Sequence, residues 1–257
     1  MSDSSILVTQ DGPVLQIRLN RPEKKHALTH AMYEQLHEAL QAAAQDPRIR
    51  AIHVSGTGDA FTSGNDLKDF AQNPPRDLDA PVFHFLESLR TAQKPIVAAV
   101  SGVAVGIGTT MLLHCDLVYC DETAHFRLPF ANLGLSPEGG SSFLLPLMAG
   151  YQKAAELLLL GEAFTAATAE KIGLVNAVLP AAELQQTSLQ RAHALAAQPA
   201  AALRLTKALL KRNSQTALAS IMRDEGTEFI ARLGAPEARE AFAAFAEKRK
   251  PDFLQFD

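Results

Sequence analysis

Residues 95–108 have the sequence PIVAAVSGVAVGIG, a short apolar run followed by small residues and glycines. The apolar run at 95–100 predicts the strongest strand of the chain, because short continuous apolar runs are typical of buried strands. Residues 102–110 predict a loop, and the apolar residues 111–113 begin a helix. A strand, a loop and a helix in this order favour an α/β fold.

The rest of the chain continues this alternation of strands and helices. Further strands are expected at 6–9, 14–19, 51–55, 117–120, 125–127 and 173–179. Helices are expected from Thr29 to about residue 45, from 67 to the prolines at 74 and 75, and from 80 to 93, and they dominate from Tyr151 onward. This order predicts one α/β domain with a helical C-terminal section.

The composition and the two ends of the chain disfavour several classes of protein. Hydrophobic residues make up 47% of the 257 residues and the net charge is −4, so neither nucleic acid nor a membrane is expected as a partner. The first residues lack the pattern of a signal or transit peptide, and the last residues are not a Ser-Lys-Leu address. Cys115 and Cys120 form no disulfide framework, so a cytoplasmic location is expected.

Glu138 stands between a proline and two glycines, in the sequence SPEGGSS at residues 136–142. The apolar residues 143–145 predict a buried helix that begins just after this turn. Apolar walls raise the pKa of a carboxylic acid, which suits a proton shuttle near neutral pH. The alternative is an acid that caps the helix or lies in its first turn, and the local sequence alone favours that commoner role.

Two turns that contain glycine and small residues, at 61–67 and 102–108, each precede a predicted helix. Backbone N–H groups in such turns favour negative charge, and two that meet at one oxygen form an oxyanion hole. The alternative is a pair of tight strand–helix connections. The spacing of Gly102, Gly106 and Gly108 does not match the dinucleotide-binding fingerprint.

Other polar clusters in the sequence predict no further chemistry. His114, Cys115, Asp116 and Cys120 lack the spacing of a zinc site, so core thiols and a hydrogen-bonded histidine are expected. The chain has no G-x-S-x-G elbow of a serine hydrolase. The basic residues 248–250 are typical of a solvated patch.

Four stretches stand out, in this order: NRPEKKHAL at 20–28, FTSGNDL at 61–67, the strand and loop at 95–108 and FAEKRKPDF at 245–253. Together they resemble the crotonase superfamily of enoyl-CoA hydratases and isomerases. The resemblance runs from about Val14 to Phe253 and implies a crotonase spiral of ββα units as the core, residues 1–200. It also implies a C-terminal helical section, residues 201–257, through which relatives form trimers or dimers of trimers.

The resemblance further implies roles for individual residues. The N–H groups of Asn65 and Ile107 would form the oxyanion hole. The coenzyme A part of the substrate would be bound by Lys24, Lys25, Ala27, Ser63, Gly64, Asp66 and Lys248. In relatives, a basic residue near the position of Lys248 approaches the phosphates bound by a neighbouring subunit. No metal and no separate cofactor are expected, since coenzyme A arrives with the substrate.

Departures from the hydratase pattern indicate the reaction. Hydratases of this superfamily carry two glutamates that activate water, and Thr110 and Phe130 occupy those places here. Residues 129–142 are instead similar to the peroxisomal-type Δ3,Δ2-enoyl-CoA isomerases, whose catalytic glutamate matches Glu138. This implies an isomerase that shifts the double bond of 3-enoyl-CoA to 2-trans-enoyl-CoA, with Glu138 as proton shuttle. The alternatives are a hydratase, a hydrolase or dehalogenase on the same scaffold, and a non-catalytic acyl-CoA-binding protein.

Overall fold

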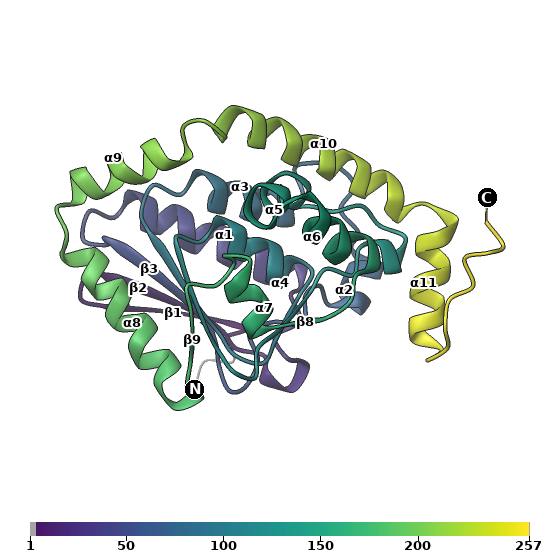
Figure 1. Ribbon diagram of the computed structural model, residues 1–257, viewed down its shortest axis with the longest axis horizontal. Helices are drawn as coiled ribbons and strands as arrows, with labels where there is room; N and C mark the ends of the chain where they lie inside the picture. The colour runs from purple at the N-terminus through teal and green to yellow at the C-terminus, as the bar shows by residue number, and fades with distance from the viewer. Residues whose placement is uncertain (1–3, 257) are drawn as a thin grey trace.

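The computed structural model describes residues 4–256 and contains two β-sheets with helices around them (Figure 1). The larger sheet has the order β1-β2-β3-β4-β6-β9 and the smaller has the order β5-β7-β8. The strands are β1 (Ile6–Asp11), β2 (Val14–Leu19), β3 (Ala51–Gly56), β4 (Ile96–Val100), β5 (Val103–Val105), β6 (Leu117–Asp121), β7 (His125–Arg127), β8 (Phe164–Thr165) and β9 (Ala177–Leu179). In the larger sheet, β1 and β2 are antiparallel and the other neighbours are parallel.

Helices connect the strands and dominate the second half of the chain, which confirms the predicted α/β class. They are α1 (His30–Gln45), α2 (Leu67–Gln72), α3 (Pro81–Thr91), α4 (Ile107–Thr110), α5 (Ser141–Ala149), α6 (Tyr151–Ala155), α7 (Ala166–Lys171), α8 (Ala181–Ala197), α9 (Ala200–Lys211), α10 (Gln215–Leu233) and α11 (Pro236–Ala246). Shorter turns are η1 (Pro22–Lys24), η2 (Met111–His114), η3 (Ala131–Leu133) and the π-helical η4 (Glu156–Leu160). No helix within residues 4–256 is both long and apolar enough to span a membrane.

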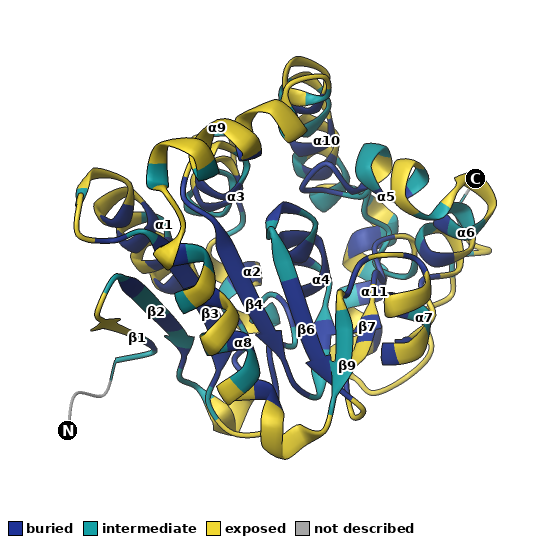
Figure 2. Cartoon of the chain, turned by 60° about the vertical axis from the view of Figure 1, so that its left-hand side comes forward, coloured by how far each residue is buried: buried dark blue, intermediate teal, exposed yellow. Residues whose placement is uncertain are grey.

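Strand β4 is buried along its whole length, as Figure 2 shows by its dark colour. Alternate residues of a strand point to opposite faces of the sheet. Val97 and Ala99 belong to a small core formed with α8, whereas Ile96, Ala98 and Val100 belong to the main core on the opposite face. The continuous apolar run therefore reflects a strand with no solvent-facing side.

Helix α1 begins where the sequence predicts it. The Thr29 side chain accepts a hydrogen bond from Met32 N–H at 3.3 Å, so Thr29 is the N-cap. Such a cap stabilises a helix by about 1 kcal/mol. Met32, Leu36 and Leu40 are buried along one face of α1, as their spacing indicates.

Two predictions about local structure are wrong. The loop expected at 102–110 contains the strand β5, because residues 103–105 pair in parallel with β7. The helix after Ser142 is not a buried helix, since only Ser141 and Leu145 of α5 are buried and Leu147 is 67% exposed. The apolar run at 143–145 thus correctly predicted the helix α5, but it did not predict that α5 is partly exposed in the single chain.

Residues 201–257 contain most of α9 and all of α10 and α11. Figure 1 shows α9 and α10 running along one side of the molecule, with α11 at one end. Leu205, Leu209 and Leu210 of α9 are exposed apolar side chains in the single chain. The trimer and the boundary at residue 200 stay predictions.

Candidate active site

A cleft of about 1320 Å³ lies between the loops that follow the strands and the C-terminal helices. It is lined by residues that are far apart in the sequence. They include Arg21, Lys24, Ala27, Ser63, Gly64, Asn65, Asp66, Val105, Gly106, Ile107, Phe130, Glu138, Phe229, Phe242, Arg249 and Lys250. The cleft thus brings together Glu138, Asn65 and Ile107, the three residues expected to carry the chemistry.

The two glycine-containing turns predicted from the sequence lie against each other in this cleft. Thr62 N–H donates to Val103 O at 2.9 Å, and Val105 N–H donates to Thr62 O at 3.1 Å. At Gly64 the φ angle is 86°, and an added Cβ would lie 2.7 Å from Val105 O. Glycine permits both the angle and the close approach, so the two turns form one wall.

Asn65 and Ile107 follow these contacts and carry backbone N–H groups that remain available. Neither N–H donates a hydrogen bond to another group within residues 4–256. Ile107 is the first residue of α4, where an N–H has no partner inside the helix. Two such donors on one wall of a cleft are what an oxyanion hole requires.

The carboxyl group of Glu138 is buried, with the residue 5% exposed. Its Oε1 accepts a hydrogen bond from the Thr110 hydroxyl at 2.5 Å, while Oε2 has no partner in the described part of the chain. Burial raises the pKa of Glu138 to about 8; the Thr110 hydrogen bond opposes this shift and the Glu225 carboxylate adds to it. An acid with this pKa can take up and return a proton near neutral pH.

The backbone of the Glu138 turn is fixed by side chains on both sides. The Ser141 hydroxyl donates to Glu138 O at 2.6 Å, and the His114 ring bonds to Gly139 O at 2.7 Å. Burial lowers the pKa of His114 to about 4, so the ring is neutral at pH 7. Because a carbonyl oxygen only accepts, the Nε2 atom of His114 carries the proton of this bond.

Helix α5 is not capped by Glu138. Gly140 precedes α5 and offers no side chain, and the Glu138 carboxyl points to Thr110 instead. The carboxylate at this helix end is that of Glu225 from α10, which accepts from Gly140 N–H at 2.6 Å and from Ser142 N–H at 2.9 Å. The capping alternative for Glu138 is therefore wrong, and sequence reasoning missed Glu225.

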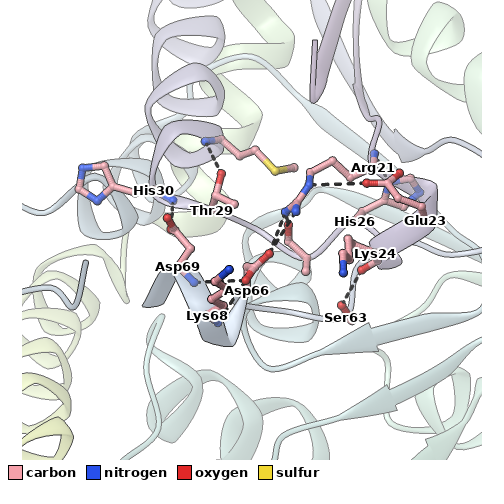
Figure 3. Close-up of polar contacts among 12 residues, drawn as sticks. Arg21, Glu23, Lys24, His26, Thr29, His30, Ser63, Asp66, Lys68 and Asp69 are labelled. Atoms are coloured by element: carbon pink, nitrogen blue, oxygen red, sulfur yellow. Dashed lines mark hydrogen bonds and ion pairs between the residues drawn. The ribbon is translucent and has the colours of Figure 1, made fainter. Parts of the chain in front are cut away.

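An ion pair joins the loop at 20–28 to the start of α2 (Figure 3). The Arg21 guanidinium donates to Asp66 Oδ2 at 3.1 Å and to Ala27 O at 2.6 Å. Partial burial opposes ionisation of Asp66, but hydrogen bonds from Asp69 N–H and from Arg21 lower its pKa overall. Asp66, expected to bind coenzyme A, thus holds two walls of the cleft together through Arg21.

The other residues expected to bind coenzyme A divide into two groups. Those that line the cleft are Lys24, Ala27, Ser63 and Gly64. Lys25 and Lys248 do not line it. Lys25 instead accepts a hydrogen bond from Ser63 N–H through its carbonyl oxygen at 2.9 Å, so its backbone supports the turn.

The C-terminal stretch at 245–253 lies beside the cleft of its own chain. Arg249 and Lys250 line this cleft together with Glu138, whereas the resemblance implied a basic residue reaching a neighbouring subunit. Arg249 is ion-paired with Glu240 and Glu247. Lys250 is therefore better placed than Lys248 to offer a positive charge to a bound phosphate.

Phenylalanine side chains from several helices and loops form an apolar wall of the cleft. They are Phe70, Phe83, Phe130, Phe229, Phe242, Phe245 and Phe253. The Phe70 ring lies edge-on to Phe229 and Phe242, with ring centroids 6.2 and 6.4 Å apart. These ring contacts join α2 to α10 and α11. No local pattern in the sequence distinguishes Phe229 or Phe242 from an ordinary core residue, so the sequence did not indicate their place in the cleft.

Tyr33 of α1 is a further residue that the sequence did not reveal. Its buried hydroxyl donates to the Asn65 side-chain oxygen and so holds the residue whose N–H lines the cleft. Burial, together with the charges of Glu138 and Asp69, raises the pKa of Tyr33 well above its usual value. The hydroxyl therefore stays protonated and remains a donor.

Within residues 4–256, no three or more His, Cys, Asp or Glu side chains are grouped so that they could hold a metal ion. Cys115 and Cys120 are free thiols that pack into the core, as expected. Burial raises the pKa of each thiol to about 12, so neither is a reactive thiolate at neutral pH.

Comparison with known proteins identifies the family. Residues 9–255 match the family described as enoyl-CoA hydratase/isomerase. The chain belongs to the enoyl-CoA hydratase/isomerase family. The solved structure entitled "Structure of Pseudomonas aeruginosa OdaA" is 44% identical over 95% of this chain and 99% of that chain, with a TM-score of 0.92. The predicted crotonase fold and superfamily are thereby confirmed.

Relatives of this enoyl-CoA hydratase/isomerase family member carry both kinds of name. Enoyl-CoA delta isomerase 2 of Rattus norvegicus is 36% identical over 96% of this chain, which spans only 64% of the rat protein. The 2,3-dehydroadipyl-CoA hydratase of Escherichia coli K12 is 34% identical over 97% of this chain and 98% of that protein. The names of these relatives do not decide between the two reactions, so the reaction has to be argued from the site.

Proposed function

We propose that this enzyme isomerises 3-enoyl-CoA thioesters to 2-trans-enoyl-CoA. The observation that carries the proposal is the buried Glu138, whose Oε2 has no hydrogen-bond partner in the described part of the chain. Among the described residues, the carboxylates that line the cleft are Asp66 and Glu138, and Asp66 is bound to Arg21. Moving one proton between two carbons of the same substrate needs a single base.

In the proposed reaction, Oε2 of Glu138 takes a proton from C2 of the substrate. The C2–H bond breaks, and its electrons spread over C2 to C4 and the thioester oxygen as a dienolate. The N–H groups of Asn65 and Ile107 stabilise the negative oxygen. Glu138 then returns the proton to C4, which leaves the double bond between C2 and C3.

Two residues beside the proposed base disfavour hydration. Thr110 is fully buried and donates its hydroxyl to Glu138, and Phe130 adds an apolar ring to the cleft wall. Neither side chain can activate water as a general base. The phenylalanine wall also keeps water from the dienolate, which would otherwise be protonated by solvent.

Coenzyme A would bind as part of the substrate, with no further cofactor or metal in the proposed reaction. Lys24 and Lys250 at the cleft are suited to its phosphates. In the proposed binding mode, the pantetheine arm would pass Ala27 and Ser63, which also line the cleft.

The proposal is tested by incubating the protein with trans-3-hexenoyl-CoA and following the absorbance of the conjugated 2-enoyl thioester. We expect conversion, together with slower hydration of crotonyl-CoA. An inert protein would contradict the proposal. Hydration of crotonyl-CoA that outpaces isomerisation would instead support the hydratase alternative.

The rate of isomerisation should depend on pH through Glu138. A base is active only when deprotonated, and the pKa of Glu138 is raised to about 8. We therefore expect kcat/KM to rise about tenfold per pH unit below about pH 8 and to level off above it. Thr110→Val removes the hydrogen bond that lowers this pKa. It should therefore move the limb, which is the rising part of the kcat/KM profile, to higher pH. A profile that is flat from about pH 6 to about pH 9.5 would contradict this assignment.

A further inference from the structure

Helix α10 lies over the turn that carries Glu138. Glu225 of α10 is only 8% exposed, and its two carboxylate oxygens accept hydrogen bonds from two N–H groups of the turn. The bonds come from Gly140 at 2.6 Å and Ser142 at 2.9 Å. Hydrogen bonds from backbone N–H groups to a carboxylate are among the stronger ones in proteins.

The packing around Gly140 makes this contact specific. Gly140 has a φ angle of 76°, and an added Cβ would lie 2.4 Å from a methyl carbon of Leu218, also on α10. The turn and the helix therefore meet with no room for another side chain. On the opposite side, Thr110 and His114 hold the Glu138 carboxyl and the Gly139 carbonyl.

The carboxylate of Glu225 also acts on Glu138 through its charge. The titratable and charged groups around the turn are Glu225 on α10, Glu138 itself, His114 on η2, Tyr33 on α1, Lys211 on α9, and Glu87 and Arg90 on α3. His114 is neutral and Tyr33 is protonated near pH 7, while Glu87 and Arg90 pair with each other. Lys211 acts on His114, and the neighbouring charge that acts on Glu138 is that of Glu225. Burial raises the pKa of Glu225 above its usual value, and the hydrogen bonds from Ser142 and Gly140 oppose this shift.

We propose that Glu225 is a positioning residue, which fixes the Glu138 turn through two backbone hydrogen bonds and sets the pH range in which Glu138 works. The inference rests on the proposed function in one respect, since it takes Glu138 as the base. It assigns to α10 a role in the proton transfer besides its role in lining the cleft.

Two variants distinguish the effect of the Glu225 charge from the effect of its side-chain length. Glu225→Gln removes the charge and leaves one acceptor oxygen for the two N–H groups. The rising part of the kcat/KM profile for trans-3-hexenoyl-CoA should therefore move down by about one pH unit, and the kcat plateau should also fall. Glu225→Asp keeps the charge but shortens the side chain, so the kcat plateau should fall about tenfold with no downward movement of the limb. Glu228→Gln, an exposed site one turn further along α10, is the matched control and should behave as wild type.

A second readout keeps the inference separate from the isomerase assignment. Exchange of the C2 protons of hexanoyl-CoA in deuterated water needs only the base and the oxyanion hole. If the wild type exchanges but does not isomerise, the proposed function fails and the Glu225 variants are compared by exchange. The pH profiles of the wild type and of Glu225→Gln are compared in whichever assay, isomerisation or exchange, shows activity. If their rising parts lie at the same pH, the inference is overturned. If the wild type shows neither reaction, Glu138 is not the base and both are overturned.

Discussion

Replacing Glu138 by glutamine is expected to lower kcat for isomerisation of trans-3-hexenoyl-CoA by about 10²- to 10⁴-fold. The amide has nearly the same size but cannot take a proton from C2. It can still accept the hydrogen bond from the Thr110 hydroxyl, so the cleft should keep its shape. The dissociation constant for the saturated hexanoyl-CoA, measured by calorimetry, should therefore stay close to that of the wild type.

The other cleft-lining carboxylate provides the comparison. Asp66→Asn weakens the pair with Arg21 and loosens the loop at 20–28, so it should raise KM more than it lowers kcat. A Glu138→Gln enzyme that retains more than about a tenth of the wild-type kcat would show that another group moves the proton. Equal losses of kcat in both variants would show that they act by disturbing the cleft as a whole.

Replacing Ile107 by proline is expected to lower kcat by about 10²- to 10³-fold, because it deletes one N–H of the proposed oxyanion hole. Ile107 is the first residue of α4, a position at which proline fits the helix well. The change therefore removes a hydrogen-bond donor with little demand on the backbone. Steady-state kinetics with trans-3-hexenoyl-CoA would measure the loss.

The Ile107 side chain is itself buried, so its removal has to be assessed separately. Ile107→Ala keeps the N–H and deletes most of the side chain, which should cost stability of about 2–5 kcal/mol but much less of kcat. Thermal unfolding of both variants provides the stability comparison. If the alanine and proline variants lose kcat equally, the N–H of Ile107 has no special role.

Local patterns were sufficient for most of the fold because many elements have strong local causes. The N-cap at Thr29 and the apolar run of β4 each depend on neighbouring residues. Strand β5 was missed because its three residues are ordered by pairing with β7, which a local pattern does not contain. The exposure of Leu147 was missed because apolarity predicts burial only where another surface is available.

The site was predictable only where residues sit in recognisable stretches. Glu138, Asn65 and Ile107 came from motifs that resemble a family, and the structure brings them into one cleft. Glu225 lies 85 positions from Gly140, and Tyr33 lies 32 positions from Asn65. Contacts over such separations are set by how helices pack, so no spacing in the sequence could indicate them.

The hydrogen bonds between Glu225 of α10 and the Glu138 turn join residues that are synthesised at different times. A chain is synthesised from its amino end, and a domain generally folds as a unit. The loops that carry Asn65, Ile107 and Glu138 are therefore made well before Glu225, and before Phe242 and Lys250 of the C-terminal cleft wall. Until residues 215–233 have been synthesised and packed as α10, the Glu138 turn lacks the two hydrogen bonds that Glu225 accepts from it.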